Sequence, residues 1–101
     1  MAMTLKAVTS CLGYQQITSL SSATGLTVPA TDAFGNKQQP TFALIVAETQ
    51  PVRWRDDGTN PTASVGMPLA VGIPLQYDGD LTKIKFIEQA ASAKINISYY
   101  A

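Results

Sequence analysis

One stretch restricts the fold of this chain more than any other: residues 52–63, with the sequence VRWRDDGTNPTA. Apolar and charged side chains alternate over residues 52–55, which places them on opposite faces of a strand. Asp57 and Gly58 follow, and glycine in such a dipeptide accepts the positive φ of a tight turn. Pro61 then lacks the N–H that a further strand would need. This combination predicts β-structure for the second half of the chain.

Two apolar segments strengthen the β prediction. Residues 41–47 form the most hydrophobic run, and the prolines on both sides favour a short strand buried on both faces over a helix. Residues 94–100 alternate most cleanly of all. Their expected inward side chains are Ile95, Ile97 and Tyr99.

Two further segments complete the pattern. Residues 81–88 place Ile84 and Phe86 on one face of a strand. Residues 68–77, which glycine and proline interrupt, fit two short strands or one bent edge strand. Turn signals therefore recur every eight to twelve residues, a spacing typical of antiparallel sandwiches and barrels. We predict an all-β fold, a small antiparallel β-sandwich or a jelly-roll-like barrel with long N-terminal loops.

The N-terminal half is less regular. We expect one domain over residues 1–101, with residues 1–10 as an extended arm or edge strand and a first strand at residues 3–10. Gly13 is expected to interrupt the pattern. The segments that follow are expected to be a strand or connecting arm at 14–18, a loop or helical turn at 19–25, an extended segment at 26–29, and a loop at 31–40 with a turn at Gly35-Asn36.

Composition restricts the class of partner. Charged residues make up 14% of the chain, against about 25% in an average domain. A surface so poor in charge indicates that a partner or further copies of the chain cover part of it. Seven basic and seven acidic residues give no net charge, which argues against a nucleic-acid partner. No apolar window is long enough for a membrane span.

The residue types that most enzymes need are scarce. Histidine is absent and Cys11 is the single cysteine, so neither a Cys/His dyad nor a zinc site can be built from this sequence. The aspartates that flank glycines are expected to form turns, because no bidentate glutamate follows at calcium-loop spacing. They are Asp56, Asp57, Asp78 and Asp80. We therefore expect no enzymatic activity, no metal, no cofactor and no small-molecule substrate.

A few polar and aromatic residues remain as candidates for an interface with another subunit or another protein. They are Arg53, Arg55, Asp56, Asp57, Thr59 and Tyr100, and the segment 1–5 could add a strand to a neighbour. Local pairing of the arginines with Asp56 or Asp57 is the competing interpretation. Trp54 is expected in the core, with a ligand-stacking role as the alternative.

Blocks of sequence between residues 42 and 100 resemble a family of small bacteriophage head-associated proteins. The blocks are FALIV at 42–46, VRWRDDGT at 52–59, PTAS at 61–64, GMPL at 66–69, YDG at 77–79, FI at 86–87 and SYY at 98–100. Some members of that family are similar to capsid cement or decoration proteins. The resemblance implies a β-sandwich or jelly-roll-like domain that forms a homotrimer on the major capsid protein.

This resemblance also implies a location and a mechanical role. The protein would be made in the host cytoplasm and would sit on the capsid surface of the virion, where each trimer bridges neighbouring capsomers. Two other functions stay open at this point. One is a β-rich adaptor or receptor-binding module in the tail, neck or fibre. The other is a carbohydrate-binding domain that uses Trp54 and tyrosines as a stacking platform.

Overall fold

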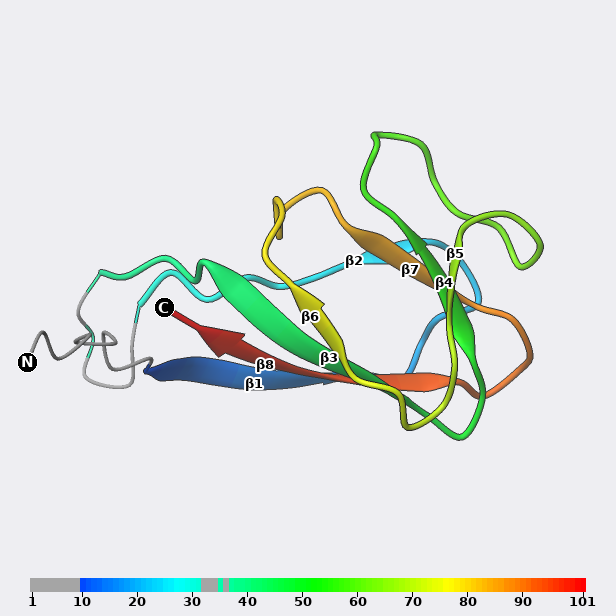
Figure 1. Ribbon diagram of the computed structural model, residues 1–101, viewed down its shortest axis with the longest axis horizontal. Coiled ribbons are helices and arrows are strands. Elements are labelled where there is room, and N and C mark those ends of the chain that lie inside the picture. Colours follow the sequence, from blue (N-terminus) through cyan, green and yellow to red (C-terminus); the bar gives the residue numbers. More distant parts are fainter. Residues whose placement is uncertain (1–9, 32–34, 36) are drawn as a thin grey trace, which may run out of the picture.

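The computed structural model describes residues 10–31, 35 and 37–101, which form two antiparallel four-stranded sheets (Figure 1). No helix occurs within these residues. The first sheet has the order β1-β8-β3-β6. Its strands are β1 (Cys11–Ile17), β8 (Lys94–Tyr100), β3 (Phe42–Glu48) and β6 (Leu75–Tyr77).

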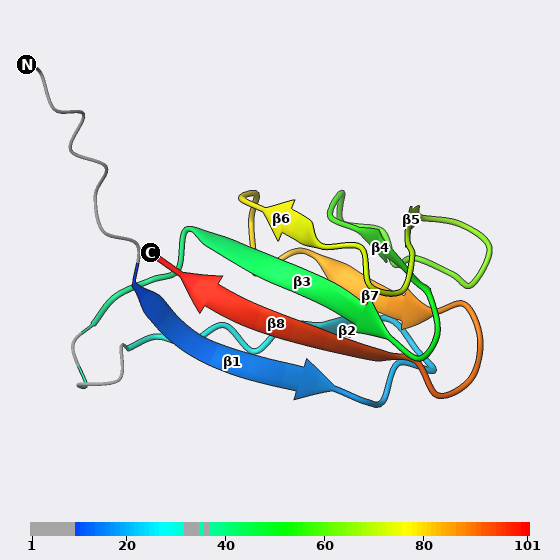
Figure 2. The same cartoon turned by 60° about the horizontal axis from the view of Figure 1, so that its bottom comes forward.

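The second sheet is built from shorter strands in the order β2-β7-β4-β5. They are β2 (Thr24–Gly25), β7 (Lys85–Glu88), β4 (Val52–Arg55) and β5 (Met67–Leu69). Figure 2 shows this sheet behind the first one. The expected all-β, sandwich-like fold is confirmed.

The two central strands of the first sheet pair along their whole length. β3 and β8 run from the Phe42–Tyr100 pair to the Glu48–Lys94 pair without a register shift. Side chains on a strand alternate between faces, so this pairing brings the inward residues of both strands together on one surface. Ile45 faces Ile97 there, and both are fully buried.

The core lies between this inner surface and the second sheet. Val52, Leu69 and Phe86 come from the second sheet, and loop residues close the ends. Burial of these apolar side chains is the main favourable term for a domain of this size. The largest fully buried side chains are Tyr99, Phe86, Leu20, Ile45, Ile84, Ile95, Ile97 and Val52.

The N-terminal half differs from the expectation in two ways. Gly13 does not interrupt a strand: it lies inside β1, where the register with β8 shifts between Cys11 and Gly13. A bulge of this kind absorbs one extra residue and lets the strand continue. Residues 24–25, expected in a loop or helical turn, pair with β7 as β2. The expected strand at 3–10 and the arm lie largely outside the described residues, as does Asn36 of the expected turn.

The interpretation of residues 41–47 was right about the strand and wrong about its burial. One face of β3 is fully buried, with Ala43, Ile45 and Ala47. The other face, with Leu44 and Val46, is only half-buried. The second sheet covers one side of the first sheet, and no described element covers the other side.

Several other expectations for the second half of the chain are confirmed, but the strand expected at residues 81–88 begins only at Lys85, as β7. β4 begins at Val52, and Gly58 follows it in a turn with a φ of 87°. The broken run at 68–77 forms two short strands, and these belong to different sheets. Ile84 and Phe86 are both buried, while Lys85 between them is exposed.

The two faces of β3 allow a matched test of the core. Ile45→Ala and Leu44→Ala each remove three carbons from the same strand. Ile45→Ala should lower the free energy of unfolding by about 2–5 kcal/mol, because it leaves a cavity in the core. Leu44→Ala should cost less, about 1 kcal/mol, since its side chain is only partly buried and leaves no enclosed cavity. Urea unfolding monitored by tryptophan fluorescence measures both, and equal losses would contradict the assigned faces.

Candidate interaction surfaces

The side chain of Arg53, expected at an interface, holds a loop of its own chain. Its Nε donates to the carbonyl of Ala63 at 3.2 Å, and its Nη1 donates to the carbonyl of Gly66 at 2.9 Å. The backbone of Gly66 passes so close that a Cβ there would lie 3.1 Å from Cβ of Arg53, and its φ is 145°. Glycine is therefore required where β4 and the loop meet.

Arg55 and Asp57 pair with each other where the chain turns after β4. We call residues 55–59 the corner. The Arg55 Nε donates to Asp57 Oδ1 at 3.0 Å, and its Nη2 donates to Oδ2 at 2.5 Å. This bidentate hydrogen bond lowers the pKa of Asp57 and raises the pKa of Arg55. The backbone N–H of Thr59 also donates to Asp57, at 3.4 Å. The carboxylate therefore forms the turn and pairs locally, although both side chains stay partly exposed to a partner.

Asp56 connects the corner to the other sheet. It accepts a 2.6 Å hydrogen bond from the hydroxyl of Tyr77 in β6. Burial of Tyr77, followed by this bond and the charge of Asp56, raises the pKa of that hydroxyl. The ring of Trp54 meets the ring of Tyr77 edge-on, with their centroids 5.8 Å apart. Trp54 is half-buried against the core, in agreement with its expected place.

Tyr100 lies on the outer face of the first sheet, which points away from the core. Its ring stacks on Phe42 with centroids 5.1 Å apart and planes inclined by 14°. Leu44 and Val46 continue this apolar strip along β3. All four side chains are only half-buried. We call Phe42, Leu44, Val46 and Tyr100 the outer strip.

A polar network borders the outer strip. The Tyr14 hydroxyl and the Gln16 amide both donate to Oδ1 of Asn96, the latter at 3.0 Å. The Nδ2 of Asn96 donates to Glu48 at 2.9 Å. The network crosses β1, β8 and β3, so it holds the outer face in a defined shape. Tyr14 itself is 63% exposed.

Apart from Tyr100, the residues of the outer strip were not predicted from the sequence. A continuous apolar run does not reveal which of its residues face the core. One signal was present in the sequence. The alternation of residues 94–100 places Tyr100 on the face opposite to Tyr99. A strand that pairs with this segment and is apolar at successive positions must also place apolar side chains on the face of Tyr100.

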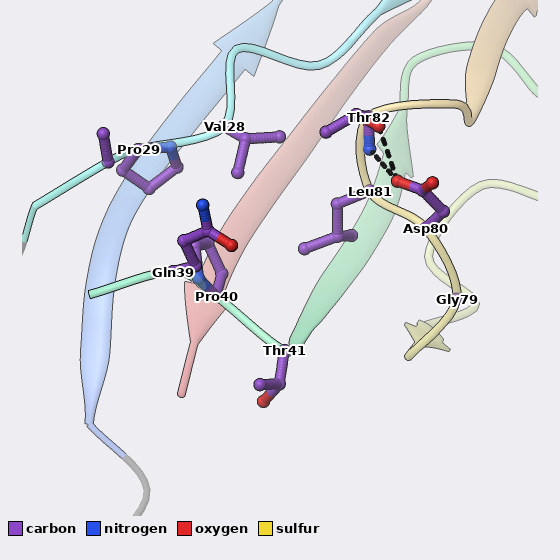
Figure 3. A pocket seen from close by; sticks show the side chains of 10 residues that line it. Val28, Pro29, Gln39, Pro40, Thr41, Gly79, Asp80, Leu81 and Thr82 are labelled. Atoms are coloured by element: carbon purple, nitrogen blue, oxygen red, sulfur yellow. Dashed lines mark hydrogen bonds between the residues drawn. The ribbon is translucent and has the colours of Figure 1, made fainter. Parts of the chain in front are cut away.

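One hollow near the ends of the strands offers little for chemistry. It has a volume of about 450 Å³ and opens between the loops before β3 and after β6 (Figure 3). Asp80 is turned toward Thr82, whose backbone N–H and hydroxyl donate to it at 2.9 and 2.6 Å. These bonds lower the pKa of Asp80. The hollow is lined by Val28, Pro29, Ala30, Gln39, Pro40, Thr41, Gly79, Asp80, Leu81 and Thr82.

Among the described residues, no group of three or more His, Cys, Asp or Glu side chains is placed to hold a metal ion. No helix there is long and apolar enough to cross a membrane. Comparisons with family models, with curated proteins and with solved structures found no match for this chain.

Two buried tyrosines predict a loss of stability in alkali. Burial raises the pKa of Tyr99 to about 12, and the pKa of Tyr77 is also raised. Unfolded tyrosine ionises near pH 10. Above that pH the unfolded chain releases protons that the folded chain keeps, so stability present below about pH 10 falls as pH rises toward about 12. Urea unfolding at stepped pH values measures this loss.

A tyrosine series identifies the groups responsible. Tyr99→Phe and Tyr77→Phe should each flatten the alkaline slope. Tyr14→Phe, at an exposed position, is the control and should leave the slope in place. A slope that persists in the double variant at Tyr77 and Tyr99 would show that other groups cause it.

Proposed function

We propose that this chain is a non-enzymatic structural protein of a phage virion, which binds the outside of the capsid lattice as a cement or decoration protein. The resemblance of residues 42–100 to small phage head proteins supports the phage context and implies three copies per assembly. The blocks that carry the resemblance supply strands to both sheets of the sandwich. They therefore belong to the framework of the domain.

The observation that carries the proposal is the outer strip on an uncovered sheet face. Large apolar side chains there stay partly exposed, in a chain with only 14% charged residues. A domain with this surface gains free energy when another protein covers it. A lattice of coat protein offers such cover repeatedly, whereas a dissolved substrate does not.

The fold suits a mechanical role. Its two sheets share one core, and the paired strands β3 and β8 lie more than forty residues apart in the sequence, so a pull on one face is spread over the whole domain. The polar network of Tyr14, Gln16, Asn96 and Glu48 stiffens the outer face. A domain of this kind that spans two capsomers resists their separation without any chemical step.

Structure determination of the virion tests the proposal. In a cryo-electron microscopy map of the phage that encodes this chain, we expect the sandwich to fit density on the outside of the capsid. Density that belongs to another protein would overturn the proposal. Recovery of the chain with isolated tails, and its absence from tailless heads, would instead establish a tail, neck or fibre role.

The binding face can be tested by matched variants. Leu44→Asp places a charge in the outer strip and should reduce occupancy on purified capsids by at least tenfold, since desolvating a carboxylate opposes burial. Ile73→Asp is the control, because Ile73 is also apolar and is 58% exposed, but lies in a loop outside the strip. Occupancy is read from co-sedimentation, and melting temperatures establish that both variants fold.

The opposite outcome is informative too. Normal occupancy for Leu44→Asp, with loss for Ile73→Asp, would exclude the outer strip as the capsid-facing surface. Loss of binding in Arg55→Glu alone would return the interface to the Arg55–Asp57 corner.

A further inference from the structure

The four edges of the two sheets are protected very differently. β6 and β2 are edge strands of three and two residues, and β5 has three residues with Pro68 at its centre. Short strands and proline are common means of blocking unwanted strand pairing. β1 has seven residues, CLGYQQI, with no proline and no Lys, Arg, Asp or Glu. Figures 1 and 2 both show it at the margin of its sheet.

The hydrogen bonds at the open end of the sheet show which groups of β1 point outward. Ser10 and Ala101 exchange two backbone bonds, of 2.9 and 3.1 Å, whereas the carbonyl of Tyr100 accepts from Thr41 on the β3 side. Backbone groups of successive residues alternate in direction. Ile97 and Ile95 therefore bond toward β1, where their partners are Gln15 and Ile17.

The residues between these partners must point the other way. The N–H and C=O groups of Tyr14 and Gln16 are directed away from β8. Among the described residues, no backbone hydrogen bond reaches β1 from that side. The Gln15 side chain is fixed beside them, since its Oε1 accepts from the Tyr99 hydroxyl at 2.7 Å and from the Thr27 N–H at 3.1 Å. The edge is thus preformed.

We propose that β1 pairs in the antiparallel direction with β1 of a second copy of this chain. A two-fold axis at Gln15 lets Tyr14 of each copy exchange backbone bonds with Gln16 of the other. The two first sheets then join into one continuous sheet. The pairing goes beyond the proposed function, because three copies around a capsid axis would have to be joined by other surfaces.

Two features favour a second copy as the partner. Among the described strands, β1 is the only long edge strand, so β1 of a second copy is the described strand that can cover its whole length. The strand also has no Lys, Arg, Asp or Glu side chain, so pairing it with itself sets no like charges opposite each other. A surface that is complementary to itself closes at two copies.

Proline at one outward position tests the pairing. Gln16→Pro removes an outward N–H and leaves the bonds to β8 intact, whereas Gln16→Ala removes the same side-chain contact with Asn96 and keeps the N–H. In sedimentation equilibrium of the full chain, native protein and Gln16→Ala should reach twice the chain mass of 10.7 kDa. Gln16→Pro should remain at the single mass over the same concentrations.

Amide hydrogen exchange tests the pairing without a variant that could misfold. In native protein, exchange at Tyr14 and Gln16 should slow at least tenfold as concentration rises, while Gln15 and Ile17 stay protected throughout. Concentration-independent exchange at Tyr14 and Gln16, or a dimer of twice the chain mass that survives in Gln16→Pro, would overturn the pairing. Capsid co-sedimentation of Gln16→Pro separates the two proposals, because loss of the pair with retained binding leaves the proposed function standing.

Discussion

The antiparallel pairing of β3 with β8 is the contact on which the rest of this structure depends. It is the longest uninterrupted register in the molecule's described part, and it joins residues more than forty positions apart. Successive side chains of both strands point to opposite faces of the sheet. One set therefore packs in the core, and the other set includes the outer strip. β1 and β6 then add to the two sides of this pair. A slip of one residue would exchange the two faces and expose Ile45 and Ile97 to water.

The second sheet is held to this pair by the stretch that looked most like a functional motif. Val52 is in the core, and Trp54 packs edge-on against Tyr77 of the first sheet. Asp56 accepts a hydrogen bond from the hydroxyl of the same tyrosine. Arg53 binds the carbonyls of the following loop. Charges and an aromatic ring crowded into a few residues therefore serve mainly to join the two sheets. Their internal bonds leave the Arg55–Asp57 pair as the part of the corner most open to a partner.

The periodicity of the sequence predicted the strands well and their surroundings less well. Alternation over 94–100 fixed both the strand and its inward face, because polar residues mark the other side. The run 42–46 has no polar residue, so its sequence does not reveal that Leu44 and Val46 face outward. Pairing across long separations, as between Phe42 and Tyr100, leaves no local signal. The bulge before Gly13 was missed because a glycine in a strand also fits an interruption.

The two sheets divide the tasks of the molecule. The second sheet has short strands, a proline on its edge and side chains that bond to its own loops, which are the features of a surface that stays unpaired. The first sheet has an outer face with partly exposed apolar side chains, and its long edge strand β1 has no Lys, Arg, Asp or Glu side chain. Interactions with other proteins are therefore expected on the first sheet. Because the face and the edge are different surfaces, one partner can cover the outer strip while another strand extends the sheet.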